Sequence, residues 1–136
     1  MLSSNNIILE TLAVLREQGV LNYVLCPGSR NAGIVHSICQ IEDFYTYTAT
    51  DERSAGFMAI GIALATNLPT AVVVTSGSAL ANLYPAACEA YYQHIPLVFI
   101  SADRPAAWIN QMDGQTMPQP DALGQMVKMS VNLPSD

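Results

Sequence analysis

Charged side chains are scarce in this sequence. Only 12% of the 136 residues are charged, and 5 lysines and arginines face 11 aspartates and glutamates, for a net charge of −6. The shortage of basic residues argues against nucleic-acid binding, which requires a basic surface. Soluble domains usually contain about 25% charged residues. With 51% hydrophobic residues, the deficit favours either a surface covered by a partner or another domain, or an unusually well-buried α/β core.

Signatures of several other protein classes are also missing. Cys26, Cys39 and Cys88 have no paired or CxxC spacing, and we expect reduced thiols in an intracellular protein. No apolar run reaches the ~20 residues of a membrane-spanning helix, and the first residues lack a secretory signal pattern, so a cytoplasmic location is expected. Neither GxxxxGK(S/T) nor GxGxxG occurs. His36 and His94 lack metal-ligand spacing, and no metal site is expected in this chain.

The sequence does contain a regular alternation of helical and extended patterns. Helices are expected from Ser3 or Ser4 to Gln18, after Pro27-Gly28 to about Gln40, and over residues 53–66, 78–94 (kinked by Pro85) and 121–126. Strands are expected over residues 23–25, 44–49, 71–74, 97–100 and 128–131. This order predicts a three-layer α/β domain, in which helices cover both faces of a mostly parallel sheet.

Four tracts rich in polar and small residues follow the predicted strands. They are residues 27–30, 51–52, 75–78 and 101–104. In open α/β sheets, ligands bind beyond the carboxyl ends of the strands. We therefore expect the four tracts to meet at one edge of the sheet.

The acidic pair Asp51-Glu52 stands between two apolar elements. By itself it indicates a helix start, with Asp51 as the cap and Glu52 in the first turn. A carboxylate at the rim of a core can instead be desolvated and act as an acid or base. The spacing alone leaves both interpretations open.

The other tracts are typical of turns that approach a ligand. Ser29 and Arg30 open a helix after a Pro-Gly turn, which suits a carboxylate or phosphate but also suits a capped helix with a solvated arginine. The 75–78 tract lets a backbone approach a ligand closely, or is an ordinary tight turn. Arg104, held before a proline, can pair with Asp103 or bind an anion.

Five motifs in register carry a family resemblance. They are Cys26-Pro27-Gly28-Ser29-Arg30, Asp51-Glu52-Arg53-Ser54-Ala55-Gly56-Phe57, Thr75-Ser76-Gly77-Ser78-Ala79, Asn82-Leu83-Tyr84-Pro85-Ala86 and Ala102-Asp103-Arg104-Pro105. Over residues 22–119 the chain resembles the N-terminal, pyrimidine-binding domain of the SEPHCHC synthases (2-succinyl-5-enolpyruvyl-6-hydroxy-3-cyclohexene-1-carboxylate synthases). These are thiamine-diphosphate enzymes of menaquinone biosynthesis.

The resemblance implies a role for each site residue on the cofactor side. Glu52 matches the family's catalytic glutamate, which bonds to a ring nitrogen of the cofactor's aminopyrimidine and exchanges a proton with it. Thr75, Gly77 and Asn82 match the wall beside the pyrimidine. Such a glutamate must be covered by another domain, since burial has to offset the preference of a helix N-terminus for an anion.

A second group of matches implies a substrate site. Ser29, Arg30, Arg104 and Gln115 match positions around isochorismate, a dicarboxylate that two arginines suit well. The other substrate in the family is 2-oxoglutarate.

The chain departs from the family pattern at three positions near these residues. They are Ala49, where a histidine is usual, Asn31, where a serine is usual, and Gly114, where an asparagine is usual.

The chain contains no Gly-Asp-Gly, the metal-binding signature of the family's diphosphate-binding domain. We expect residues 1–136 to form a single pyrimidine-binding domain, with the family's middle and diphosphate-binding domains absent and residues 133–136 as an interdomain linker. Thiamine diphosphate and Mg²⁺ would then bind only in the complete enzyme. We expect the isolated domain to be inactive, and the diphosphate-binding domain of a second subunit to complete it in a homo-oligomer.

Two alternatives stay open at this point. One is the small subunit of a two-chain thiamine-diphosphate 2-oxoacid decarboxylase. The other is a non-catalytic, flavodoxin-like interaction module.

Overall fold

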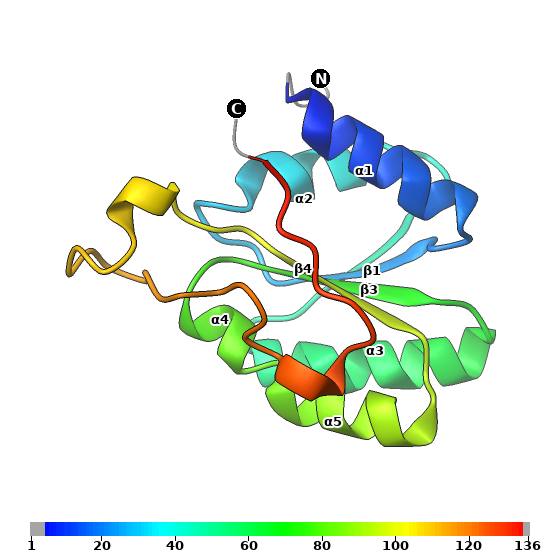
Figure 1. Cartoon of the computed structure of the whole chain (residues 1–136). Helices are drawn as coiled ribbons and strands as arrows, with labels where there is room; N and C mark the ends of the chain where they lie inside the picture. The colour runs from blue at the N-terminus through cyan, green and yellow to red at the C-terminus, as the bar shows by residue number, and fades with distance from the viewer. Residues whose placement is uncertain (1–4, 135–136) are drawn as a thin grey trace.

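Four parallel strands form the centre of the molecule. The computed structural model describes residues 5–134, and its sheet has the order β2-β1-β3-β4 (Figure 1). The strands are β1 (Asn22–Leu25), β2 (Tyr45–Thr48), β3 (Thr70–Val74) and β4 (Leu97–Ser101). All three pairings are parallel, which confirms the expected sheet.

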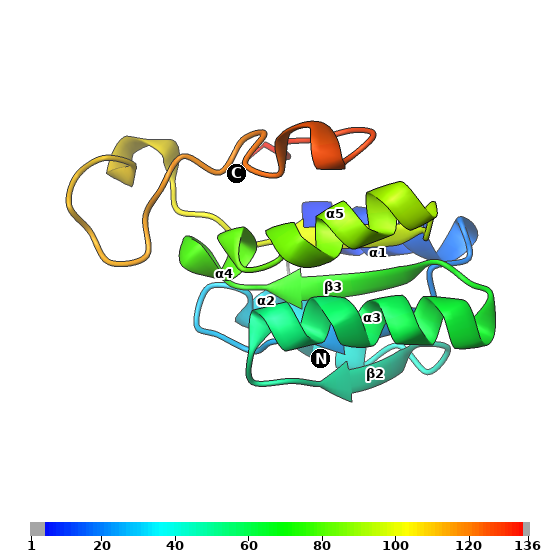
Figure 2. The same cartoon turned by 90° about the horizontal axis from the view of Figure 1, so that it is seen from below.

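Helices cover both faces of this sheet, so the three-layer prediction is confirmed. On one face lie α1 (Asn6–Glu17) and α2 (Ala32–Cys39). On the other lie α3 (Glu52–Thr66), α4 (Ser78–Ala81) and α5 (Tyr84–Gln93). Figure 1 shows the two helical layers with the strands between them, and Figure 2 looks onto the layer of α3 and α5. Two short 3-10 turns, η1 (Ala106–Trp108) and η2 (Gly124–Met126), follow β4.

The central strand β3 explains why the sheet is stable. Its apolar run is wholly buried, because successive side chains point to opposite faces and both faces are covered. Val72 and Val74 pack into the core beneath α3, α4 and α5, whereas Ala71 and Val73 pack into the core beneath α1 and α2. The edge strand β2 differs, since all four of its residues are exposed.

Side-chain caps fix the starts of two helices. The expected caps of the first helix, Ser3 and Ser4, lie outside the described residues, and the side chain of Asn5 caps α1 by accepting bonds from the backbone N–H groups of Ile7 and Ile8. Asp51 caps α3, as the sequence indicated.

The prediction of one kinked helix over residues 78–94 is wrong. The first helix, α4, ends at Ala81. Asn82 and Leu83 form a turn, and a new helix, α5, starts at Tyr84. Pro85 has no N–H for a bond within a continuous helix, but it is tolerated in the first turn of a new one.

The two elements expected near the C-terminus do not form as predicted. In place of a helix over 121–126, only η2 is present, because Asp121 (φ 57°) and Gly124 (φ 54°) adopt left-handed conformations that an α-helix excludes. Residues 128–131 form no strand. Their alternating apolar side chains satisfy the strand period, but their backbone does not pair with β4.

A broad groove lies along the free edge of β4 as a result. Residues 97–101 line one side and residues 128–134 line the other. None of the helices in residues 5–134 has both the length and the hydropathy needed to cross a bilayer.

The packing of α3 on α5 gives a stability prediction. A Cβ added to Gly56 would lie 2.5 Å from the Cβ of Ala86 on α5, so Gly56→Ala must push the two helices apart. We expect a loss of about 1–3 kcal/mol in the free energy of unfolding, measured by urea titration with circular dichroism. Gly61→Ala is the matched control on the same helix, since its Cβ would meet nothing within 4 Å. It should stabilise by about 0.5–1 kcal/mol, and equal effects of the two changes would contradict this account.

Candidate active site

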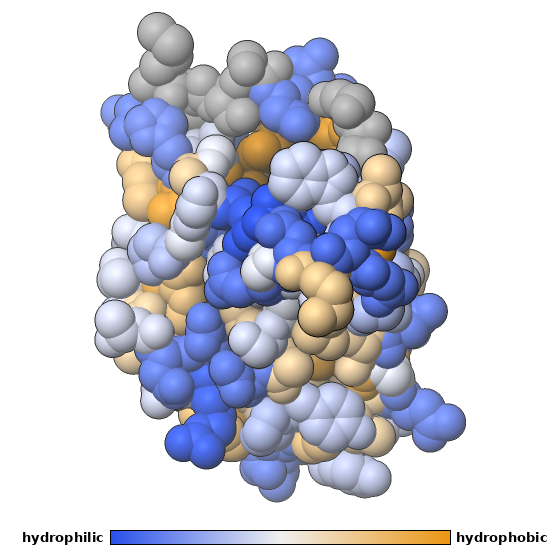
Figure 3. All heavy atoms as spheres, turned by 90° about the vertical axis from the view of Figure 1, so that its left-hand side faces the viewer, coloured by the Kyte–Doolittle hydropathy of each residue, from blue (hydrophilic) through white to orange (hydrophobic). Residues whose placement is uncertain are grey.

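The four predicted tracts do meet at the carboxyl edge of the sheet, which confirms the expected convergence. Residues 51–52 follow β2, 26–30 follow β1, 75–78 follow β3 and 102–104 follow β4, in that order across the sheet. With about 4.8 Å between neighbouring strands, the first and last tracts are about 14 Å apart. Figure 3 views the molecule from this edge and shows hydrophilic side chains gathered at its middle, with apolar side chains around them.

The two acids after β2 have different surroundings. Oδ1 of Asp51 accepts the backbone N–H of Ser54 at 2.7 Å. Hydrogen bonds from the side chain and then the backbone of Ser54 lower the pKa of Asp51, as expected for an exposed helix cap. Glu52 is half-buried in the first turn, and no hydrogen bond or ion pair within residues 5–134 engages its carboxylate. The structure confirms the helix start, with Asp51 as the cap and Glu52 in the first turn, and the role of Glu52 as an acid or base stays a prediction.

The pKa of the Cys26 thiol depends on the charge of Glu52. Cys26 ends β1 and is only 4% exposed. Burial, followed by the negative charges of Glu52 and Asp51, raises the pKa of Cys26 to about 11. The charge of Glu52 thus acts on the end of β1, and Cys26 stays a neutral thiol at physiological pH.

A buried asparagine shapes the turn after β1. Asn31 is fully buried, accepts the backbone N–H of Gly28 at 2.7 Å and donates to the carbonyl of Cys26 at 2.9 Å. This departure from the family pattern therefore supports the turn from within. Sequence reasoning missed this role, although an asparagine three residues after Gly28 is a familiar turn signal.

The turns after β1 and β3 are in direct contact. A Cβ on Gly28 would lie 2.9 Å from the Cβ of Thr75, so only glycine fits there. The Thr75 hydroxyl is buried and has no hydrogen-bond partner in the described part of the chain. A buried hydroxyl without a hydrogen-bond partner, at the sheet edge where ligands bind in such folds, fits a site that pairs with a polar group of a ligand. Asn82, by contrast, is exposed at the end of α4.

The segment after β4 folds back over the turn after β3. Gly77 has φ 73°, and a Cβ there would lie 2.9 Å from the carbonyl oxygen of Gln115. The Ser76 hydroxyl donates to this same carbonyl at 3.0 Å. This contact explains how residues distant in sequence come to line one site.

Two of the four predicted substrate residues, Arg30 and Gln115, are hydrogen-bonded to each other, and Arg104 shares the Gly114 carbonyl with Arg30. Nη1 of Arg30 donates to Oε1 of Gln115 at 2.7 Å, and Nη2 of Arg30 donates to the carbonyl of Gly114 at 3.0 Å. Nη2 of Arg104 is 3.4 Å from that same carbonyl. Ser29 is exposed beside Arg30.

The partner expected for Arg104 requires correction. Asp103 accepts the backbone N–H of Arg104, whereas the guanidinium forms its ion pair with Asp113 at 2.8 Å. Adjacent residues on an extended backbone point in opposite directions, so Asp103 could not reach the guanidinium. The guanidinium carbon also lies 5.2 Å from the centre of the Trp108 ring.

Gln119 holds this folded-back segment in place and was also missed by the sequence reasoning. Its side chain accepts the N–H of Gly77 at 2.6 Å and donates to the Ser101 hydroxyl and the Ala102 carbonyl. The side chain is only 8% exposed. No sequence pattern identifies such a link, because its partners lie on two different strands.

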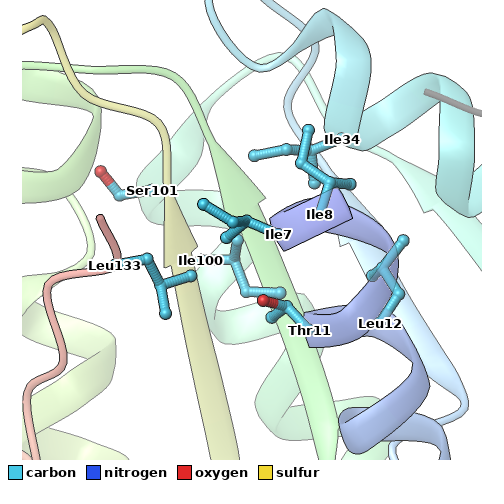
Figure 4. Close-up of a pocket in the computed structure, with 8 residues that line it drawn as sticks. All are labelled: Ile7, Ile8, Thr11, Leu12, Ile34, Ile100, Ser101 and Leu133. Carbon is cyan, nitrogen blue, oxygen red and sulfur yellow. The ribbon is translucent and has the colours of Figure 1, made fainter. Parts of the chain in front are cut away.

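Other parts of the molecule offer less chemistry. No cluster of three potential metal ligands occurs in residues 5–134, and His36 and His94 are both exposed. A pocket of about 90 Å³ lies between α1, α2 and β4 (Figure 4). Its lining is mostly aliphatic and includes none of the predicted site residues, so it is a packing gap and not a reaction site.

The chain is similar to known proteins over almost its whole length. Residues 10–126 match the family described as "Thiamine pyrophosphate enzyme, N-terminal TPP binding domain". Thiamine pyrophosphate (TPP) is another name for thiamine diphosphate. The chain is 63% identical over 134 residues to a SEPHCHC synthase of Phocaeicola vulgatus and 61% identical to one of Bacteroides fragilis. Each alignment covers 98% of this chain but only 24% of the relative's length.

Solved structures show the same fold. The chain superposes on a thiamine diphosphate-dependent 4-hydroxybenzoylformate decarboxylase of Rhodococcus jostii with a TM-score of 0.79 and 24% identity, covering 90% of this chain and 23% of that one. A putative thiamin diphosphate-dependent enzyme of Mycobacterium smegmatis gives a TM-score of 0.76 and 24% identity, covering 89% of this chain and 23% of that one. At this identity the likeness establishes the fold alone.

The position of Glu52 can be tested through Cys26. In a chain carrying Cys39→Ser and Cys88→Ser, iodoacetamide should alkylate Cys26 slowly near neutral pH, with the rate rising toward a pKa of about 11. Glu52→Gln removes a negative charge near the thiol and should lower this pKa. Asp51→Asn, the control, keeps a capping side chain and should lower it less.

The same titration has a consequence for stability. The folded chain keeps the Cys26 proton where the unfolded chain loses it, so stability is unaffected below pH 9.0 and falls as the pH rises from 9.0 to about 11. Rapid alkylation near neutral pH, or an unchanged pKa in Glu52→Gln, would contradict the placement of Glu52.

Proposed function

The chain belongs to the family of N-terminal TPP-binding domains of thiamine pyrophosphate enzymes, and we propose that it is the pyrimidine-binding domain of a SEPHCHC synthase. Such an enzyme decarboxylates 2-oxoglutarate and adds the succinyl-semialdehyde unit to isochorismate in menaquinone biosynthesis. The names and identities of the relatives support this proposal. Because the chain spans 24% of their length, other segments must supply the rest of the site.

The observation that carries the proposal is the unengaged carboxylate of Glu52 at the carboxyl edge of the sheet. Glu52 has no partner within residues 5–134, and the Thr75 hydroxyl at the same edge is buried and unsatisfied. These two groups fit a heteroaromatic ring that offers both a nitrogen and a polar substituent. Thiamine diphosphate, when bound, would supply the carbon centre at which 2-oxoglutarate loses CO₂.

Glu52 would hold and return a proton at a ring nitrogen of the cofactor. A general acid or base in this position contributes about 10²–10⁴-fold to a rate. The half-buried carboxylate needs further cover to exclude water. Exposed apolar side chains on β2, α3 and α5 suit a covering protein surface: Tyr45, Tyr47, Phe57 and Tyr84. We propose that the diphosphate-binding domain of a second subunit, which carries the Mg²⁺ site, covers this face in a homo-oligomer.

The arginine end of the edge would bind the second substrate. Ser29 and Arg30 follow β1, and the Arg30 side chain reaches Gln115. Arg104 follows β4, about three strand spacings, or about 14 Å, from the Glu52 tract. This separation leaves room for a cofactor ring and a substrate between them. Two guanidinium groups present paired N–H donors that match carboxylate oxygens, as isochorismate requires.

An exchange chimera tests the function. In the Phocaeicola vulgatus relative, the matching segment is replaced by this chain, and formation of the SEPHCHC product from 2-oxoglutarate and isochorismate is measured. We expect the chimera to be active and Glu52→Gln within it to lower kcat by about 10²–10⁴-fold, because the amide keeps its size but cannot exchange the proton. Asp51→Asn, which keeps the helix cap, is the control and should retain most of the activity.

Two outcomes would contradict the proposal. A correctly folded chimera that decarboxylates 2-oxoglutarate but never uses isochorismate would favour a decarboxylase subunit. Full activity of Glu52→Gln would remove Glu52 from the mechanism and favour a module with no catalytic part.

The arginines should behave differently from Glu52. In the same chimera, Arg30→Ala and Arg104→Ala should each raise the KM for isochorismate by about 10–100-fold, since each loses charge-assisted hydrogen bonds to a carboxylate. The affinity for thiamine diphosphate should stay unchanged. Arg16→Ala is the control, because Arg16 pairs with Asp43 away from this edge. A larger loss of cofactor affinity than of isochorismate affinity would reverse the assignment of roles.

A further inference from the structure

Two arginine side chains converge on one neutral oxygen. Nη2 of Arg30 and Nη2 of Arg104 lie 3.0 Å and 3.4 Å from the carbonyl oxygen of Gly114. Two positive charges this close repel each other, so the arrangement needs an anion. Within residues 5–134, the ion pair with Asp113 is the only one that either arginine makes.

Asp113 satisfies these arginines only in part. Its Oδ2 meets a single nitrogen of Arg104, Nη2, at 2.8 Å. The Nε atoms of both Arg30 and Arg104 are shielded from solvent and have no acceptor in the described part of the chain. A carboxylate that meets a guanidinium side-on accepts from two nitrogens at once. Two N–H donors are therefore left without an acceptor by Asp113 and the Gly114 carbonyl, and a new acceptor can reach them only if the side chains around them move.

The backbone of the segment that carries Asp113 is strained. Asn110, Met112 and Gln115 all have positive φ angles, of 64°, 59° and 55°. Such conformations are rare and unfavourable for residues other than glycine. A segment held in this way gains free energy from any rearrangement that relaxes it.

We propose that Asp113 is an internal stand-in for a substrate carboxylate, which holds Arg104 until a dicarboxylate displaces it. The identity of that dicarboxylate as isochorismate rests on the proposed function, whereas the displacement itself rests on the contacts above. The Arg104–Asp113 pair is partly exposed, with 20% and 38% of the two side chains accessible, so it is a weak pair that a ligand can replace. When a dicarboxylate binds both arginines, the single contact between Asp113 and Arg104 is replaced by two paired contacts, one at each guanidinium group.

The displacement predicts a gain of affinity on loss of the Asp113 charge. The probe is isophthalate (benzene-1,3-dicarboxylate), a stable dicarboxylate, titrated into this chain by calorimetry or by NMR. Asp113→Asn should bind it about 3–10-fold more tightly than the unaltered chain, since a competing charge is gone. Asp103→Asn is the matched control, because it makes the same charge change next to Arg104 but leaves the guanidinium pair intact. It should change the affinity less than 2-fold by the same reasoning.

Further variants separate competition from other effects. In Asp113→Asn combined with Arg104→Ala, the gain should vanish, because the contested cation is missing. Circular dichroism checks that each variant folds, and Asp113→Ser serves as a second replacement. Weaker binding in Asp113→Asn, unchanged binding, or no binding by any variant at the highest soluble concentration would overturn the proposal. Weaker binding would instead make Asp113 a group that orients Arg104 for its ligand.

The chimera extends the test to the reaction. Asp113→Asn there should lower the KM for isochorismate by a similar factor with kcat unchanged, which a purely structural role would not do. A chimera without synthase activity would sink the proposed function, but the isophthalate titration would still decide the role of Asp113.

Discussion

The register of the parallel sheet is the constraint on which the candidate site depends. Leu25 at the end of β1 is level with Thr48 on one side and with Val73 on the other, and Val74 is level with Ser101 of β4. All four strands therefore end at the same level of the sheet. A slip of one residue in any pairing would turn each side chain of that strand to the opposite face and expose its apolar set. The buried valines of β3 thus fix the position of the polar turns at this edge, and the carbonyls of Val73 and Val74 accept hydrogen bonds from Cys26 and Ala102 at the start of two of them.

Sequence patterns predicted the parts of the molecule that follow from local chemistry. The four strands, the cap at Asp51 and the meeting of the four tracts follow from residue periodicity and from the behaviour of parallel sheets. The link through Gln119 could not be predicted, because it depends on a side chain meeting backbone groups of distant turns, whereas the local turn bonds of Asn31 carry a sequence signal that was missed. The strand expected over residues 128–131 shows the opposite failure, since a correct period does not create a hydrogen-bonding partner.

The two ends of the candidate site differ in how many of their polar groups have hydrogen-bond partners. Near β4, the polar groups are closely interlinked, as Gln119 uses both ends of its amide and each arginine has at least two contacts. Next to β2, Glu52 stands without a partner within residues 5–134, and the Thr75 hydroxyl after β3 is also unsatisfied. The β4 end is therefore organised by the chain itself. The β2 end is rigid in its backbone but chemically incomplete, as expected of a surface that meets a ligand and another protein surface.

The contact between Gly28 and Thr75 also limits how this sequence can evolve. The nearest atom to a Cβ at position 28 is the Cβ of Thr75, at 2.9 Å, and every residue except glycine carries that atom. Replacing Thr75 with serine or alanine would therefore not make space. A side chain at position 28 becomes acceptable only if position 75 gives up its own, and with it the hydroxyl at the edge. As long as selection keeps a side chain at position 75, no residue other than glycine is tolerated at position 28, although Gly28 itself contributes no chemical group.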